Sequence, residues 1–481
     1  MPERTVTHRL LLKNAPWTMI SARVEDNLRP LPWTVDVQTQ TDQLMEAKRW
    51  WTKDLTRLRR TYKFWRNQAR IQRRAGRWRP DLETRAKVAS KEYHDWIRKQ
   101  KKAHWDEFLA EDANIWKAAS YLQPSKGAMD DKVPPLKKKD GSMTKDSMEQ
   151  AKELLGTFPP PLPEWIETED RRSRRAALSM PDLTLVEIEK VLAAKPWKAP
   201  GEDGLPAMVW RRLWPVVKHR VWTLFDRSLR DGVVPHQWKS ARIIPLKKPD
   251  KGDYTVAKAW RPISLLSTLG KIMEAVVAER ISYAVETSGL LPANHFGARK
   301  RRSAEQALLL LQEHIYKAWW AGKVLSLISF DVKGAYNGVC KERLLQRMIA
   351  RGIPGGQVRW TDAFCSGKTA CVVVNGHTSE RRELSRSGLP QGSPLSPILF
   401  LFFNADLVQR KINANGGSIA FVDDYTAWVT GPTADDNRAD IQSIIDDALK
   451  WEARSGATFE ADKSAVIHFT RTAARSSDKP I

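Results

Sequence analysis

The sequence predicts an α+β protein with a basic helical region at its N-terminus, and three observations support this prediction. From about residue 181 onward, helical patterns alternate with short apolar strands, without an internal repeat. The first 125 residues are helical in character and rich in Arg and Lys. Carboxylates stand at the ends of two apolar strands, where burial is costly unless a cation or hydrogen bonds compensate the charge.

The net charge of the chain indicates a polyanionic partner. Lys and Arg number 80 against 56 Asp and Glu, a net charge of +24, while the hydrophobic fraction of 42% is ordinary for a folded protein. Nucleic acid is the usual partner of so basic a chain, and a solvated basic surface without a partner is the alternative. No apolar run approaches the roughly 20 residues of a membrane-spanning helix, and the N-terminus lacks the pattern of a secretory signal. Three cysteines without metal-ligand spacing suit a reducing compartment, so we expect an intracellular protein with no membrane partner.

The N-terminal region, residues 1–125, is expected to form a basic helical hairpin. Between Arg57 and Arg74, basic residues are interleaved with aromatic ones, and Pro80 ends the pattern. A second helical pattern runs over about 82–110 and carries further aromatic residues. Arg and Trp on helices bind phosphates and stack on bases. The same aromatic residues also pack helices against one another, and packing is the preferred interpretation for most of the Trp residues.

Residues 126–180 are interpreted as a linker that contains one short helix. The linker is polar and contains Pro and Gly, with a proline-rich break over 158–163. Helix and strand patterns then resume, and Thr184 with Glu187 forms the capping-box signature of a helix start. The catalytic unit is therefore placed at residues 181–481.

Two strand patterns end in carboxylates. The apolar run that begins at Leu325 ends at Asp331, and a second apolar run meets Asp423 and Asp424 before a further strand begins. The second pattern predicts a hairpin with its acidic residues at the turn. Carboxylate oxygens bind Mg²⁺, and two such ions about 4 Å apart catalyse phosphoryl transfer, which requires the two strands to be neighbours. Two adjacent aspartates in a turn, taken by themselves, more often cap a surface loop. The surrounding motifs therefore decide between capping and metal binding.

The residues and the order of several motifs favour catalysis. The motifs are FDVKGAYN (330–337), GLPQGSPLSP (388–397) and FVDD (421–424), preceded by KAPGEDGLP (198–206), WRPISLL (260–266) and HFGARK (295–300). In this order they resemble the motifs of reverse transcriptases of non-LTR (LINE-type) retrotransposons, similar to those of filamentous fungi. The resemblance covers about residues 182–471. Two positions depart from the family's pattern: Val422 stands where Ala is more usual, and Ala298 replaces an aromatic residue, which is expected to loosen the contact with the template.

The resemblance implies a right-handed polymerase with fingers and palm. Asp331, Asp423 and Asp424 match the palm carboxylates that hold two Mg²⁺ ions, for which Mn²⁺ can substitute. The main-chain carbonyl of Val332 is implied as a further ligand. Lys463 matches the lysine that protonates the departing pyrophosphate, with a solvated lysine at a strand edge as an equal alternative.

The resemblance also assigns residues that neutralise the triphosphate. Lys247 and Arg261 match fingers residues with this role, which suits Lys point charges and Arg forks. Whether Lys247 or its neighbour Lys248 points inward stays open.

Three further residues are implied to contact the incoming nucleotide. Tyr336 matches an aromatic residue that lies beneath the sugar and excludes a 2′-hydroxyl, with a core aromatic as the alternative. Gln391 is expected to touch the nucleotide, and Gly392 permits close approach of the backbone.

The implied function is that of an RNA-directed DNA polymerase, with an RNA template, a DNA primer and deoxynucleoside triphosphates. An element-encoded RNA-binding protein is a further partner, and the nucleus is the expected location during integration. A catalytically inactive, RNA-binding remnant of a degraded element is the alternative function. A telomerase, an intron maturase or a viral RNA polymerase fits the motifs less well. No endonuclease is expected before residue 182, and the thumb is expected to be absent or incomplete.

Overall fold

The chain divides into two compact units, residues 16–132 and residues 133–481. The computed structural model describes residues 17–33, 35–46, 53–74, 79–92, 95, 132–138, 140–158, 163, 165–169, 172–194, 199–249, 251–384 and 388–472. Among these residues, no helix combines the length and apolar character needed to cross a membrane.

The smaller unit is helical throughout its described residues. It contains α1 (Trp17–Leu28), α2 (Val37–Glu46), α3 (Lys53–Arg74) and a further helix over 80–92. Arg85 of the last helix lies over the ring of Trp65 in α3, 4.8 Å from the ring centroid, and Arg73 pairs with Glu83. The two helices therefore pack together, in agreement with the predicted hairpin, and Trp65 serves this packing. Most of the second predicted stretch, including Trp96 and Trp105, lies outside the described residues.

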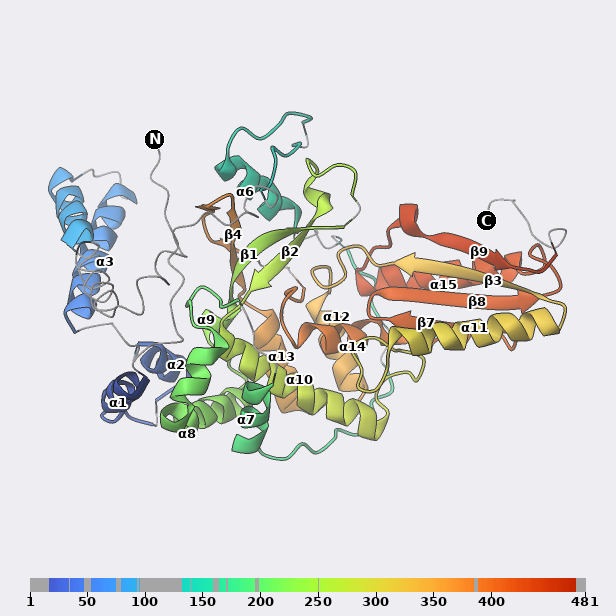
Figure 1. Cartoon of the computed structure of the whole chain (residues 1–481), viewed down its shortest axis with the longest axis horizontal. Helices are drawn as coiled ribbons and strands as arrows, with labels where there is room; N and C mark the ends of the chain where they lie inside the picture. Colours follow the sequence, from blue (N-terminus) through green and yellow to red (C-terminus); the bar gives the residue numbers. More distant parts are fainter. Residues whose placement is uncertain are drawn as a thin grey trace, which may run out of the picture. The chain divides into compact units, whose positions relative to one another are not determined.

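The larger unit is built from two sheets and the helices around them (Figure 1). Its helices are α6 (Ser147–Thr157), α7 (Leu185–Ala193), α8 (Ala207–Asp231), α9 (His236–Lys239), α10 (Thr268–Ser288), α11 (Ala304–Trp320), α12 (Lys341–Ala350), α13 (Gly355–Cys365), α14 (Ser396–Gln409) and α15 (Arg438–Ser455), with 3-10 turns η2 (Ala257–Ala259) and η3 (Ala461–Lys463). Its strands are β1 (Ser240–Lys247), β2 (Trp260–Leu265), β3 (Val324–Asp331), β4 (Thr369–Val374), β5 (His377–Thr378), β6 (Arg382–Glu383), β7 (Gly416–Phe421), β8 (Asp424–Gly431) and β9 (Ala465–Phe469). This mixture of helices and strands agrees with the predicted α+β class.

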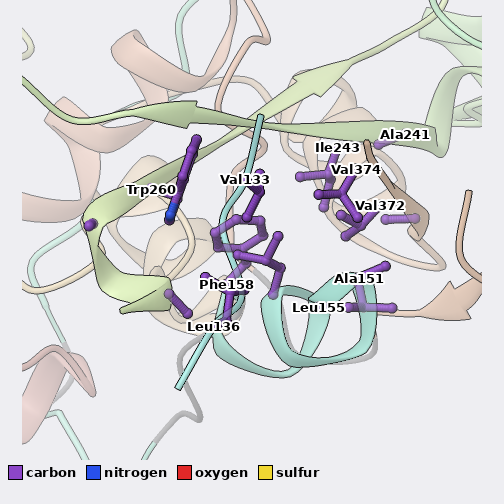
Figure 2. Packing of buried hydrophobic residues seen from close by; sticks show 14 of the residues in the cluster. Val133, Leu136, Ala151, Leu155, Phe158, Ala241, Ile243, Trp260, Val372 and Val374 are labelled. Atoms are coloured by element: carbon purple, nitrogen blue, oxygen red, sulfur yellow. The ribbon is translucent and has the colours of Figure 1, made fainter. Parts of the chain in front are cut away.

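The first sheet has the order β2-β1-β4-β5, with β6 also paired to β4. Only the β1–β4 pair is parallel among these strands. Its core joins strand residues such as Ile243, Trp260 and Val372 to Val133 and Leu155, which precede the catalytic unit predicted from the sequence (Figure 2).

The segment interpreted as a linker is therefore largely part of this unit. The compact unit begins at Val133 rather than at residue 181, because α6 and its flanking residues fill the core of the first sheet. The short helix predicted in the segment is α6, capped by Asp146. Further on, an extended strap (residues 165–169 and 172–180) crosses the unit, with the amide of Arg175 bonded to the Ala350 carbonyl at 3.0 Å. Pro and Gly mark breaks in regular structure, but they do not show whether the intervening residues are packed.

The second sheet is antiparallel, with the order β7-β8-β3-β9. α11 covers one face, where Ile315 contacts a cluster that includes Leu325 and Trp428. On the other face, Phe330 stacks against Tyr425 and contacts Phe459. β3 is buried along most of its length because helices lie on both of its faces, which explains why most of its residues are apolar.

Candidate active site

Two of the predicted aspartates lie directly opposite each other on neighbouring strands. In the β3–β8 ladder, Asp331 is the partner of Asp424. Opposite residues of an antiparallel pair lie on the same face of the sheet, with Cβ atoms about 5 Å apart. The last residue of β3 and the first residue of β8 therefore bring two carboxylates together. This confirms that the two acidic strands are neighbours, as catalysis by this pattern requires.

Asp423 occupies the turn that joins β7 to β8. Phe421 pairs with Asp424, so only Val422 and Asp423 stand between the two strands. This confirms the predicted hairpin with acidic residues at its turn. Burial, followed by the negative charges of Asp424 and Asp331, raises the pKa of Asp423 above its ordinary value. Burial and Asp331 raise the pKa of Asp424 in the same way.

Lys463 reaches this group of carboxylates from a segment far along the chain. The amide of Glu460 donates to the carbonyl of Asp331 at 2.9 Å, and the amide of Lys333 donates to the carbonyl of Thr458 at 2.8 Å. This pairing places Lys463 so that its ammonium binds the carboxylate of Asp331. The ion pair raises the pKa of Lys463, which therefore keeps its proton at neutral pH.

The three aspartates are neighbours but do not form a closed metal-binding group. Within the described part of the chain, no group of three or more His, Cys, Asp or Glu side chains is arranged to hold a metal ion. Asp331 is instead held by Lys463. Val332, the predicted main-chain ligand, forms an isolated bridge with Phe459 at the end of β3.

Tyr336 lies between the aspartates and the Gly388 motif. Its half-buried ring packs edge-on against Phe400 of α14, with centroids 5.6 Å apart. Burial, and then the charge of Asp423, raises the pKa of Tyr336 to about 12. The carbonyl of Tyr336 accepts a hydrogen bond from the amide of Leu389 at 2.6 Å. A Cβ at Gly388 would lie 2.3 Å from the same carbonyl oxygen, so this contact requires glycine.

The turn that carries Gln391 and Gly392 is bound to β2. The amide of Ser264 donates to the carbonyl of Gln391 at 2.7 Å. Gly392 has a φ of 125°, and a Cβ there would lie 2.5 Å from the carbonyl oxygen of Ser264. The turn can approach β2 this closely only because position 392 is glycine. The structure thus joins two motifs that lie about 130 residues apart in the chain.

Lys247 and Arg261 fall on opposite faces of the β1–β2 ribbon. Lys247 pairs with the buried Trp260, and its ammonium lies 5.3 Å from the ring centroid of Tyr254. Arg261 pairs with Leu246 on the exposed face. Lys248 follows the strand, and its pKa is lowered by burial and by the nearby charges of Lys463, Lys251 and Arg261. Lys248 is therefore grouped with Arg261 and Lys463, while the role of Lys247 at the triphosphate stays a prediction.

The comparison with protein families agrees with this geometry. The family model described as reverse transcriptase (RNA-dependent DNA polymerase) matches residues 246–479. The chain contains a reverse transcriptase domain. The match includes every predicted site residue, and reverse transcriptases generally use divalent metal ions.

Several polymerases of mobile elements are similar to this reverse transcriptase domain. The probable RNA-directed DNA polymerase from transposon X-element of Drosophila melanogaster is 26% identical over 310 residues, which is 63% of this chain and 34% of the relative. The RNA-directed DNA polymerase from mobile element jockey of Drosophila funebris is 29% identical over 303 residues, 61% of this chain and 32% of the relative. The chain thus spans about a third of the length of these relatives. A solved structure of apo telomerase from Candida Tropicalis, truncated from its C-terminal domain, is similar over 50% of this chain and 52% of the telomerase chain, at 15% sequence identity. Its TM-score of 0.36 is too low to support an argument.

These relatives confirm the predicted resemblance to reverse transcriptases of mobile elements. The similarity to elements of filamentous fungi stays a prediction, since these two relatives come from Drosophila. The motif at 198–206 precedes the matched region, and its Lys198 lies outside the described residues.

Three buried residues of the reverse transcriptase domain escaped the sequence-based assignment of the site. Asn404 donates to the carbonyl of Val422 at 2.7 Å, and the imidazole of His295 contacts the same Asn404 side chain at 3.0 Å. Glu274 accepts a hydrogen bond of 2.5 Å from the hydroxyl of Ser393. A single Asn within the apolar run of α14 was the available signal, because buried amides are almost always hydrogen-bonded.

Proposed function

We propose that this chain is the polymerase part of a non-LTR retrotransposon protein and acts as an RNA-directed DNA polymerase. The observation that supports this best is the placement of Asp331 opposite Asp424, with Asp423 in the adjoining turn. The relatives printed as RNA-directed DNA polymerases of mobile elements support the same activity. In this proposal, the second sheet belongs to the palm, and the β1–β2 ribbon belongs to the fingers.

Asp331, Asp423 and Asp424, with the main-chain carbonyl of Val332, would hold two Mg²⁺ ions or Mn²⁺ in their place. The donors fit hard divalent cations, because they are oxygen atoms and the pKa values of Asp423 and Asp424 are raised by burial and then by the neighbouring negative charges, which a cation would compensate. When bound there, the ions would supply activation of the primer hydroxyl and stabilisation of the leaving oxygen. The ammonium of Lys463 carries the proton that the departing pyrophosphate accepts.

The incoming nucleotide would lie between the carboxylates and the β1–β2 ribbon. Arg261 and Lys248 supply positive charge for the triphosphate, with Lys248 in the role expected of Lys247. Gln391 is held at this place through its carbonyl bond to Ser264. Tyr336 excludes the 2′-hydroxyl, and its ring is fixed by its contact with Phe400.

The proposed partners are an RNA template, a DNA primer and deoxynucleoside triphosphates, with an element-encoded RNA-binding protein as a further partner. The basic helices of the smaller unit would bind RNA phosphates through residues such as the exposed Arg66 and Arg70. The nucleus is the proposed location during integration.

Primer extension on an RNA template with dNTPs and Mg²⁺ tests the proposal. The wild-type chain should extend the primer, and Asp423→Asn with Asp424→Asn should abolish extension while RNA binding persists. The matched control is Asp435→Asn with Asp436→Asn, an exposed pair of adjacent aspartates elsewhere in the same unit, which should leave extension unchanged. RNA binding without extension by the wild-type chain would instead support the inactive remnant.

A further inference from the structure

The turn that carries Asp423 has an unfavourable backbone conformation. Val422, its first residue, has a φ of 58°. Branching at Cβ makes this left-handed region costly for valine, and such a residue keeps the conformation only where its surroundings hold it. The side chain at this position is also one of the two places where the sequence departs from the family's usual motif.

Asn404 holds the turn from one side. Its amide nitrogen donates to the Val422 carbonyl at 2.7 Å, and its amide oxygen lies 3.0 Å from Nε2 of His295. A carbonyl only accepts hydrogen bonds, so the orientation of the amide is fixed, and His295 must donate through a proton on Nε2. Both side chains are fully buried, at 1% and 0% exposure. Burial also lowers the pKa of His295 to about 4, which keeps the imidazole neutral.

The segment around His295 holds the turn from a second direction. The amide of Phe296 donates to the Ala420 carbonyl at 2.8 Å, and the amide of Ala420 donates to the Asn294 carbonyl at 3.1 Å. This pairing presses Gly297 against the turn, where an added Cβ would lie 2.4 Å from the nitrogen of Val422. The HFGARK motif is therefore in direct contact with the acidic turn.

We propose that His295 and Asn404 are positioning residues that hold the left-handed conformation of Val422 and thereby place Asp423 and Asp424. The pair, together with Gly297, is called the turn clamp. This inference rests on the proposed polymerase function for its catalytic consequence. Its structural part, the support of a strained turn, is independent of that function.

The decisive experiment removes the clamp and then removes the strain. Asn404→Leu is nearly isosteric and suits the apolar surroundings of α14, so the fold should persist while both hydrogen bonds are lost. We expect kcat for dNTP addition to fall on the order of 10- to 100-fold, with KM and RNA affinity nearly unchanged. Val422→Asn supplies a residue that tolerates positive φ. The double variant should therefore recover at least about tenfold of the lost kcat, because its turn needs less support.

A matched control separates this role from the general loss of a buried amide. Asn437 is also buried and donates to the Val324 carbonyl at 3.0 Å, at the opposite end of β3 from Asp331. Asn437→Leu should lower the Tm without a selective loss of kcat, and Val422→Asn should not rescue it. Equal kcat losses in the two Leu variants, or independent effects of Asn404→Leu and Val422→Asn, would overturn the proposal.

Thermal unfolding without metal or nucleic acid distinguishes a failure of the clamp from a failure of the proposed function. The fall in Tm caused by Asn404→Leu should be smaller in the Val422→Asn background than in the wild type. A wild-type chain that does not extend primers but shows this coupling would refute the polymerase function and support the clamp. Additive Tm shifts would refute the clamp, whatever the activity.

Discussion

At the scale of single residues, Tyr336 lies near the aspartates, where the incoming nucleotide is proposed to bind. Its ring is anchored on Phe400 and lies near enough to Asp423 for the charge of Asp423 to raise the pKa of Tyr336. A sugar bound over the carboxylates would meet this ring. The geometry agrees with a role in sugar selection and does not require one, since the same contact with Phe400 also fills the core.

Tyr336→Val is predicted to admit ribonucleotides, because it removes the ring from the 2′ side of the sugar. The ratio of kcat/KM for rNTPs to that for dNTPs should rise on the order of 10- to 100-fold. Steady-state primer extension with each nucleotide type measures this ratio. Tyr336→Phe keeps the ring and should leave the ratio unchanged. An unchanged ratio in an active Tyr336→Val variant would make Tyr336 a core residue.

Glu274 gives a prediction for the dependence of stability on pH. It is buried in α10, its carboxylate accepts a hydrogen bond from Ser393, and the charged groups that face it are Lys271 and Lys368. Burial raises its pKa from 4.5 to about 7. The stability that Glu274 contributes is therefore fully present below about pH 4.5 and is lost as the pH rises through about 7.

Glu274→Gln should behave like the protonated wild type at every pH. We expect the variant to be more stable than the wild type at pH 8 by roughly 1–3 kcal/mol, with little difference at pH 4.5. Urea unfolding across this pH range measures the difference. Between pH 5 and 8, the free energy of unfolding should decline less in the variant than in the wild type, because the contribution of Glu274 is absent. A parallel decline in both proteins would contradict the assignment.

At the scale of secondary-structure elements, the paired helices of the smaller unit present their basic residues to solvent. Within the hairpin, Arg85 contacts the ring of Trp65 and Arg73 pairs with Glu83, while Arg70 is exposed. The basic surface thus includes Arg70 and the exposed Arg66, whose guanidinium lies over the ring of Tyr62 in the same helix. We expect these arginines to bind RNA phosphates.

Arg66→Gln with Arg70→Gln is predicted to reduce the salt dependence of RNA binding. The slope of log affinity against log salt should become shallower by roughly 0.7–0.9 for each phosphate contact removed. Filter binding or anisotropy over a salt series measures this slope. Lys317→Gln, which alters a lysine already paired with Glu313 on α11, serves as the control and should not change the slope. An unaltered slope in the double variant would assign RNA binding to other residues.

At the scale of the larger unit, a buried ionic cluster ties the strap to the helices. The guanidinium of Arg347, which is fully buried, binds Glu169 of the strap and lies 3.1 Å from Asp406 of α14. Arg172 of the strap pairs with the same Asp406. The strap is thereby held to α12 and α14, in a segment that the sequence suggested was a linker.

Arg347→Met should destabilise the larger unit by about 3 kcal/mol, because it leaves Glu169 and Asp406 buried without their principal cation. Chemical denaturation measures the loss. Lys450→Met removes an exposed cation from Asp447, which keeps Arg410 as a partner, and should have little effect. A small loss for Arg347→Met would show that Arg172 and Arg351 satisfy the two carboxylates.

The chemistry of the site could be read from short stretches of sequence. The apolar runs that end at Asp331 and at Asp423 predict buried strands with terminal carboxylates, and the turn glycine at 392 predicts a close backbone approach. These features are local, because strand periodicity, turn residues and ligand type depend on neighbours in the chain.

Tertiary structure alone decided which of these residues meet. The placement of Lys247 and Arg261 on opposite faces depends on the register between β1 and β2, since a shift of one residue moves a side chain to the other face. The contact of Lys463 with Asp331, and that of Asn404 with Val422, join residues 132 and 18 positions apart through the packing of separate elements. The sequence by itself determined that this chain carries the residues of a reverse transcriptase. Only the fold determined how the turn beneath Asp423 is supported, because that support comes from buried partners whose proximity no local pattern encodes.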